Sequence, residues 1–76
     1  MDIKKLIGYN IRALRELRAI TQSDLGKKVR LHGAYIGSVE RGERNISVEN
    51  LLKIARALSV PVHILLTEGV DQWIKG

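Results

Sequence analysis

The side chains that most often carry out catalysis or bind metal ions are sparse in this chain. Its two histidines, His32 and His63, lie far apart, and neither belongs to a zinc-binding pattern such as H-E-x-x-H. The chain has no cysteine, which excludes a thiolate metal site and a disulfide framework. Gly33 and Gly37 do not follow a strand, as a phosphate-binding loop requires. We therefore expect no enzymatic activity, no metal and no cofactor.

A stretch of mixed polar and apolar residues, 21–41 (TQSDLGKKVRLHGAYIGSVER), indicates two short helices separated by about four residues. We expect its apolar residues to face a common core: Leu25, Val29, Ile36 and Val39. We expect five others to face outward: Gln22, His32, Ala34, Tyr35 and Ser38. Two helices joined by such a turn form the helix-turn-helix motif, whose second helix enters the major groove of DNA.

The charge of the chain favours a polyanionic partner. Lys and Arg number 13 against 8 Asp and Glu, which gives a net charge of +5. Residues 59–76 contain Glu68, Asp71 and Lys75, so the basic excess lies in the first 58 residues. Such a balance is typical of proteins that bind nucleic acid. Solvated lysines on any soluble protein explain it equally well, so the charge alone does not decide the function.

The length of 76 residues allows one domain, which we assign to residues 1–76. A chain of this size is marginally stable alone and gains from packed helices or from a partner. No apolar run approaches the roughly 18 residues that span a bilayer. The first residues carry charges throughout and lack a cleavage site, so we expect no signal peptide and a cytoplasmic location.

The apolar spacing predicts an all-α fold, a compact bundle of about five short helices with a core over residues 3–66. The expected helices cover residues 3–18, 22–29, 33–41, 48–58 and 61–66. Thr21 with Asp24 forms a capping-box pattern, Ser47 is a second N-cap, and Pro61 suits the first position of a helix. Thr67 is a candidate cap for one more turn carrying Val70, Trp73 and Ile74.

Gly26 lies inside the helix expected over residues 22–29. Glycine costs roughly 1 kcal/mol against alanine there, so we expect close approach of the following helix to compensate. A simple flexible spot is the alternative.

The segments T-Q-S-D-L-G, Y-I-G-S-V-E-R-G-E-R-N-I-S and E-N-L-x-x-I-A-R-A-L follow one another at a specific spacing. Together with R-A-L-R-E-L-R before them, they resemble the λ-repressor-like, or XRE-type, helix-turn-helix family over roughly residues 6–66. The resemblance implies a DNA-binding transcriptional regulator, commonly a homodimer on inverted-repeat operators. Small members include phage repressors, controller proteins of restriction–modification systems and antitoxin-type autoregulators.

The resemblance also implies roles for residues around the first helix of the motif. Gln22 matches a glutamine that contacts a DNA phosphate and braces the recognition helix, and Thr21 precedes it at the capped helix start. An exposed glutamine without a role is the alternative. Arg15 and Glu40 occupy the positions of an ion pair between the first helix and the recognition helix.

The resemblance places the recognition helix at about residues 33–41. Its reading surface should contain His32, Gly33, Ala34, Tyr35, Gly37 and Ser38. Partial packing against the core is the alternative role for Tyr35. Small residues at 33 and 34 cannot donate a base hydrogen bond from a side chain, although an alanine methyl can pack on a thymine methyl. Arg41, Arg44 and Asn45 match a segment that flanks the DNA backbone, with a solvated loop as the alternative.

Two positions depart from the family pattern. Arg30 replaces the glycine usual in the turn, and Ser59 replaces the glycine usual after the fourth helix. A left-handed backbone is common at the first of these, and a residue other than glycine adopts it with some strain.

The segment 61–76 has more apolar residues than a small core should absorb, including Ile64 and Val70. We expect it to form a homodimer interface, because tryptophan is favoured at interface centres. The expected interface residues are Val62, Leu65, Leu66, Trp73 and Ile74. Closure of the core by the last helix is the alternative for Val62 and Leu65.

These features predict a sequence-specific regulator that binds operator DNA as a homodimer, without a small-molecule effector domain. The alternative is a protein-interaction module, such as an antitoxin with autoregulatory DNA binding.

Overall fold

The computed structural model describes residues 2–75, which form five α-helices and one 3₁₀ helix. They are α1 (Ile3–Leu17), α2 (Gln22–Val29), α3 (Gly33–Glu40), α4 (Val48–Ala57), η1 (Val62–Leu66) and α5 (Val70–Lys75). The described residues contain no strand, so the predicted all-α fold is confirmed. Nor is any helix among them long and apolar enough to cross a membrane.

The helices begin where local capping groups place them. The Thr21 hydroxyl accepts a hydrogen bond from the Asp24 backbone N–H at 3.0 Å, and the Asp24 carboxylate accepts one from the Thr21 N–H at 3.1 Å. These two bonds complete the predicted capping box of α2. Ser47 caps α4 through the backbone N–H of Asn50, at 3.1 Å. Asp2 likewise caps α1, a role that the sequence had not suggested to us.

The segment after α4 differs from the expectation in three ways. Pro61 has extended backbone and precedes the helix, which is 3₁₀ rather than α. The Asn10 side-chain amide donates to the carbonyls of Ile64, Leu65 and Thr67 at 3.3, 2.9 and 2.9 Å, so these carbonyls are bound to α1. The Thr67 hydroxyl donates to the carbonyl of His63 instead of capping α5.

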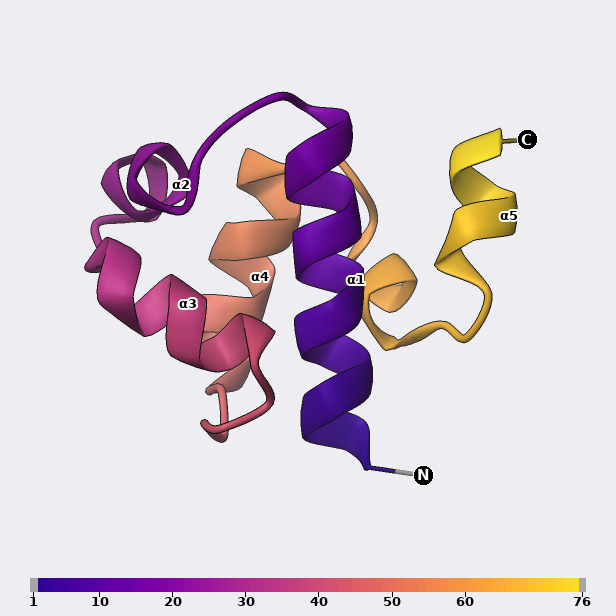
Figure 1. The fold of residues 1–76 in the computed structure, drawn as a ribbon, viewed down its shortest axis with the longest axis horizontal. Coiled ribbons are helices and arrows are strands. Elements are labelled where there is room, and N and C mark those ends of the chain that lie inside the picture. Colours follow the sequence, from indigo (N-terminus) through magenta and orange to yellow (C-terminus); the bar gives the residue numbers. More distant parts are fainter. Residues whose placement is uncertain (1, 76) are drawn as a thin grey trace.

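Helix α1 runs through the middle of the molecule, with α2 and α3 on one side and η1 and α5 on the other (Figure 1). Helix α4 packs against α2 and η1. The core includes the four apolar residues predicted from the helix pair: Leu25, Val29, Ile36 and Val39. It extends to Val70, beyond the expected limit at residue 66, so α5 closes one end of the core.

Close backbone contacts explain two of the glycines. A Cβ on Gly26 would lie 2.5 Å from the carbonyl oxygen of Leu31 in the turn and 3.0 Å from the backbone nitrogen of Gly33, the first residue of α3, so close approach does require glycine there. A Cβ on Gly8 would collide with the carbonyls of Val39 and Glu40. Gly8 therefore allows α1 and α3 to pack closely, which was not predicted.

Within residues 2–75, three residues other than glycine have left-handed backbone: Ala19, Arg30 and Ser59, with φ of 58°, 60° and 59°. Arg30 and Ser59 thus have a backbone conformation that glycine adopts without strain. Arg30 is the C-cap residue of α2, and Ser59 follows Leu58, the C-cap residue of α4.

Candidate nucleic-acid interface

A buried ion pair connects the first helix to the end of α3. The Arg15 guanidinium donates to both carboxylate oxygens of Glu40, with N···O distances of 2.7 and 3.1 Å. The side chains are 11% and 3% exposed, respectively. A third Arg15 hydrogen bond, 3.0 Å long, goes to the carbonyl of Ile20 in the loop before α2. The hydrogen bonds to Glu40 raise the pKa of Arg15 above its ordinary value.

Gln22 joins this pair from α2. Its side-chain amide donates to Glu40 at 3.0 Å, so one carboxylate is held by residues of α1 and α2. The charge of Glu40 is therefore compensated, and the carboxylate does not oppose a phosphate bound near the start of α2. The amide nitrogen of Gln22 has a second N–H, which no hydrogen bond within residues 2–75 uses.

The start of α2 opens onto a shallow hollow of about 710 Å³ between α1 and α2. Its lining residues are Arg15, Glu16, Ala19, Ile20, Thr21, Gln22 and Ser23. The first backbone N–H groups of a helix lack partners within the helix and favour an anion. The capping carboxylate of Asp24 lies in the same turn, and its hydrogen bonds to Thr21 lower its pKa. A phosphate would therefore meet donors on the Gln22 side of this turn.

The reading surface of α3 is smaller than expected. His32 and Ala34 are exposed, whereas Gly33 is half-buried because its Cα packs on α2: a Cβ there would lie 3.1 Å from the Cα of Ser23. Gly37 is buried beneath the side chains of Gln22 and Arg41, so its expected place on the reading surface is wrong. Its lack of a side chain leaves room for the amide of Gln22.

Tyr35 and Ser38 lie half-buried on the same helix. The Tyr35 hydroxyl accepts a hydrogen bond from the Asn50 amide at 3.3 Å, and the Arg44 guanidinium lies over the ring, 5.6 Å from its centroid. Ser38 donates its hydroxyl hydrogen to the Tyr35 carbonyl at 2.7 Å. In this arrangement the Ser38 oxygen can accept, but not donate, a further hydrogen bond.

Asn50 is the contact residue of this surface that sequence reasoning missed. It is a polar, half-buried residue in the first turn of α4. Its N–H completes the Ser47 cap and its amide holds Tyr35. Only its polar character among the neighbouring leucines signalled such a role.

The loop after α3 presents exposed polar side chains: Arg41, Arg44 and Asn45. Arg41 pairs with Glu43 through two bonds of 3.1 Å, which raise the pKa of Arg41 and lower that of Glu43. Exposed pairs of this kind contribute little, so Arg41 can exchange Glu43 for a phosphate at small cost.

The five residues expected at a dimer interface differ in how far they are buried within the protomer. Leu65 is fully buried within the protomer, so its assignment to the interface is wrong and the alternative, core closure, holds for it. Val62 and Ile74 are half-buried against the core. Leu66 and Trp73 remain 44% and 40% exposed. Tyr9 holds α5 on α1 through a 2.7 Å hydrogen bond to Asp71.

Known proteins match this chain in sequence and in fold. The family described as Helix-turn-helix matches residues 11–65. The chain is 43% identical over 67 residues to the control protein C.SmaI of Serratia marcescens, covering 88% of this chain and 80% of that protein.

Two solved structures are similar in both fold and sequence. The restriction-modification controller protein C.AhdI of Aeromonas hydrophila has a TM-score of 0.79 and 37% identity, with 82% of this chain and 90% of that chain covered. The DNA-binding domain of the P22 C2 repressor has a TM-score of 0.83 and 36% identity, with 95% and 93% covered.

Proposed function

The chain belongs to the λ-repressor-like, or XRE-type, family of helix-turn-helix transcription regulators, and we propose that it binds inverted-repeat operator DNA as a homodimer. The family consists of DNA-binding regulators rather than enzymes. In this proposal α3 enters the major groove, and a cytoplasmic location follows from action on bacterial or phage operators.

The hydrogen-bonded unit of Arg15, Gln22 and Glu40 carries the proposal. It fixes α3 against α1 and α2 and compensates the only carboxylate at the end of α3. A rigid recognition helix is needed because base hydrogen bonds depend on sub-ångström placement. The same unit leaves an N–H of Gln22 for a phosphate, which sets the register of α3 on the duplex.

Direct base contacts are few in this proposal. Ala34 packs its methyl group against a thymine methyl, and Ser38 accepts a hydrogen bond from a base amino group. His32 contacts the edge of the groove, while Tyr35 positions Arg44 on the phosphate backbone. With so few direct contacts, part of the specificity comes from DNA shape and deformability.

A second copy of the chain supplies the remaining contacts. One recognition helix covers only a few base pairs, and a two-fold dimer places two of them about 34 Å apart, one turn of DNA. Leu66 and Trp73 are the exposed apolar residues of the C-terminal segment and form the centre of the proposed interface. Val62 and Ile74 flank them.

Selection of bound sites from a pool of random duplexes tests the proposal. The expected result is an inverted repeat whose half-sites are about one turn apart. Binding should also persist in excess competitor DNA and weaken linearly in log K against log salt. Recovery of no shared motif, or binding abolished by competitor, would contradict operator recognition and favour the protein-interaction alternative.

A further inference from the structure

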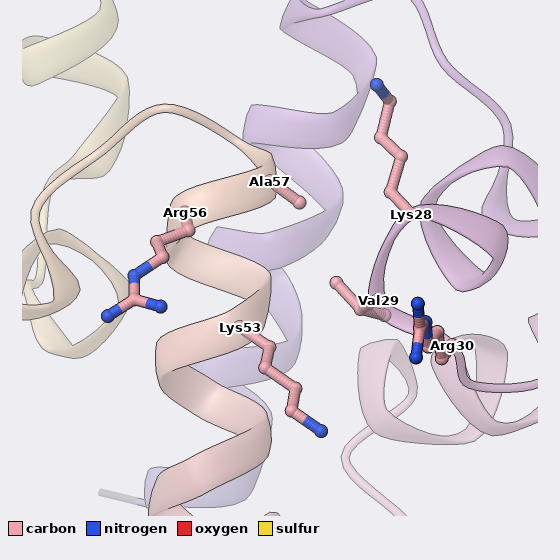
Figure 2. A pocket seen from close by; sticks show the side chains of 6 residues that line it. All are labelled: Lys28, Val29, Arg30, Lys53, Arg56 and Ala57. Carbon is pink, nitrogen blue, oxygen red and sulfur yellow. The ribbon is translucent and has the colours of Figure 1, made fainter.

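A second basic surface lies away from the proposed DNA contacts. It is a hollow of about 460 Å³ between the C-terminal parts of α2 and α4, which we call the basic hollow. Its lining residues are Lys28, Val29, Arg30, Lys53, Arg56 and Ala57. Figure 2 shows cationic side chains on both sides of it, Lys28 and Arg30 from the end of α2 and Lys53 and Arg56 from α4, with the Arg56 guanidinium extending away from α2.

Charge in the basic hollow is of one sign only. Its four cationic residues are exposed, no carboxylate lines it, and none of the four forms an ion pair within residues 2–75. Helix dipoles account for Lys28 and Arg56, which lie in the last turns of their helices. The dipole of α2 also favours Arg30, the C-cap residue of that helix, but it does not account for Lys53 in the middle of α4.

Arg30 is the least expected of the four. Its backbone is left-handed, with φ of 60°, a conformation that glycine adopts without strain. The fold alone would be served better by glycine at this position. A cation is present there nonetheless, and it faces the same hollow as Lys53.

The location of the basic hollow leaves α3 free. Gln22 is at the opposite end of α2, about 10 Å along the helix axis at 1.5 Å per residue. Asn50, which contacts Tyr35, is in the first turn of α4, while Arg56 is in its last turn. A partner in the basic hollow is therefore expected to leave the outer face of α3 open to DNA.

The shape and the helix ends decide which anion fits. Both helices present their C-terminal carbonyls here, and no helix N-terminus offers N–H groups, which disfavours a compact phosphate. Val29 and Ala57 add an apolar component to the lining. A peptide matches both features, because its carboxylates are spread out along the chain and its apolar side chains can pack beside them. We propose that the basic hollow binds an acidic peptide segment of a partner protein, with an apolar side chain packed on Val29 and Ala57.

Fluorescence anisotropy with a labelled peptide of interspersed glutamate and leucine tests the proposal at low ionic strength. The full chain should bind this peptide, and the double variant Lys53→Gln/Arg56→Gln should bind it at least about tenfold more weakly. Lys27→Gln provides the matched control, since Lys27 is exposed on α2 but does not line the hollow, and it should stay within about twofold. Thermal unfolding of each variant shows whether the fold is kept.

Two further measurements separate this surface from the DNA-binding surface. Amide chemical shifts should change at residues 27–30 and 53–58 on peptide addition, and the peptide should remain bound when a saturating duplex is added. Absence of binding, equal binding of a glutamine–leucine peptide, equal loss in Lys27→Gln, or displacement by DNA would each overturn the proposal. These results do not depend on whether the chain recognises an operator.

Discussion

Arg15 holds Glu40 by two hydrogen bonds across 25 residues of sequence, in a site that water scarcely reaches. Burying two charges costs about as much as their attraction returns, so such a pair adds little net stability. Loss of one partner is different, because the other charge is then left buried and uncompensated. The pair therefore determines how α3 sits on α1 more than how stable the domain is.

Arg15→Met should lower the free energy of unfolding by about 3 kcal/mol, because Glu40 loses its main partner. Arg12→Met is the matched control: Arg12 pairs with Glu16 one helical turn away at 3.4 Å, but both side chains are more than half exposed. Removal of that pair should cost less than about 0.5 kcal/mol. Urea denaturation measures both, and equal losses would show that Glu40 does not depend on Arg15.

Asn10→Ala should destabilise the chain by about 3 kcal/mol, because three carbonyls of the segment 64–67 lose their donor in a buried site. Amide hydrogen exchange should accelerate first in η1 and α5. Asn45→Ala, at an exposed loop position, should change stability by less than about 0.5 kcal/mol. Uniform acceleration of exchange throughout the chain would instead mean that Asn10 does not stabilise η1 more than the rest of the fold.

The helix starts were predictable because each depends on residues within one turn. Thr21 needs only Asp24, and Ser47 needs only a backbone N–H three residues later. The apolar faces of α2 and α3 were predictable for the same reason, since a spacing of three or four residues sets which side chains are buried.

The remaining features depend on contacts between distant segments, which spacing does not show. Asn10 donates hydrogen bonds to carbonyls 54 to 57 residues away. Two of these carbonyls belong to η1, the segment that is a 3₁₀ helix rather than the expected α-helix. Leu65 and Leu66 are adjacent and equally apolar, yet only Leu66 is exposed. Gly37 is buried because the Gln22 side chain covers it, a contact between two helices.

The capping box makes stability depend on pH on the acid side. Its hydrogen bonds lower the pKa of Asp24 in the folded chain relative to the unfolded chain. A lowered folded pKa means that the stabilisation is present above the unfolded pKa, about 3.9, and is lost as the pH falls through the folded value. Asp24→Asn should therefore flatten the fall in melting temperature over that range. An unchanged acid profile would show that Asp24 titrates alike in both states.

Arg44→Ala should weaken binding to all DNA sequences alike and reduce the slope of log K against log salt by about 1, because Arg44 is proposed to contact a phosphate.

Ser38→Ala should change the preferred base at one position in each half-site, by about 1–3 kcal/mol, with little effect on the slope. Lys53→Ala is the control cation, since it lies in the basic hollow, and it should change neither quantity. Salt titrations of selected and unrelated duplexes distinguish these outcomes.

Trp73→Ala should weaken the proposed homodimer by about 30-fold, because loss of a buried interface tryptophan commonly costs about 2 kcal/mol. Trp73 is 40% exposed in the protomer, as expected for a side chain that a second copy covers. Val48→Ala is the matched control, since Val48 is 73% exposed but belongs to the first turn of α4 rather than to the C-terminal segment. Sedimentation equilibrium at roughly tens of micromolar should show a dimer for the wild type and for Val48→Ala, and dissociation for Trp73→Ala. A wild-type monomer that Trp73→Ala leaves unchanged would contradict this interface. Two-fold operator binding by such a monomer would mean that the dimer contact lies outside residues 61–76.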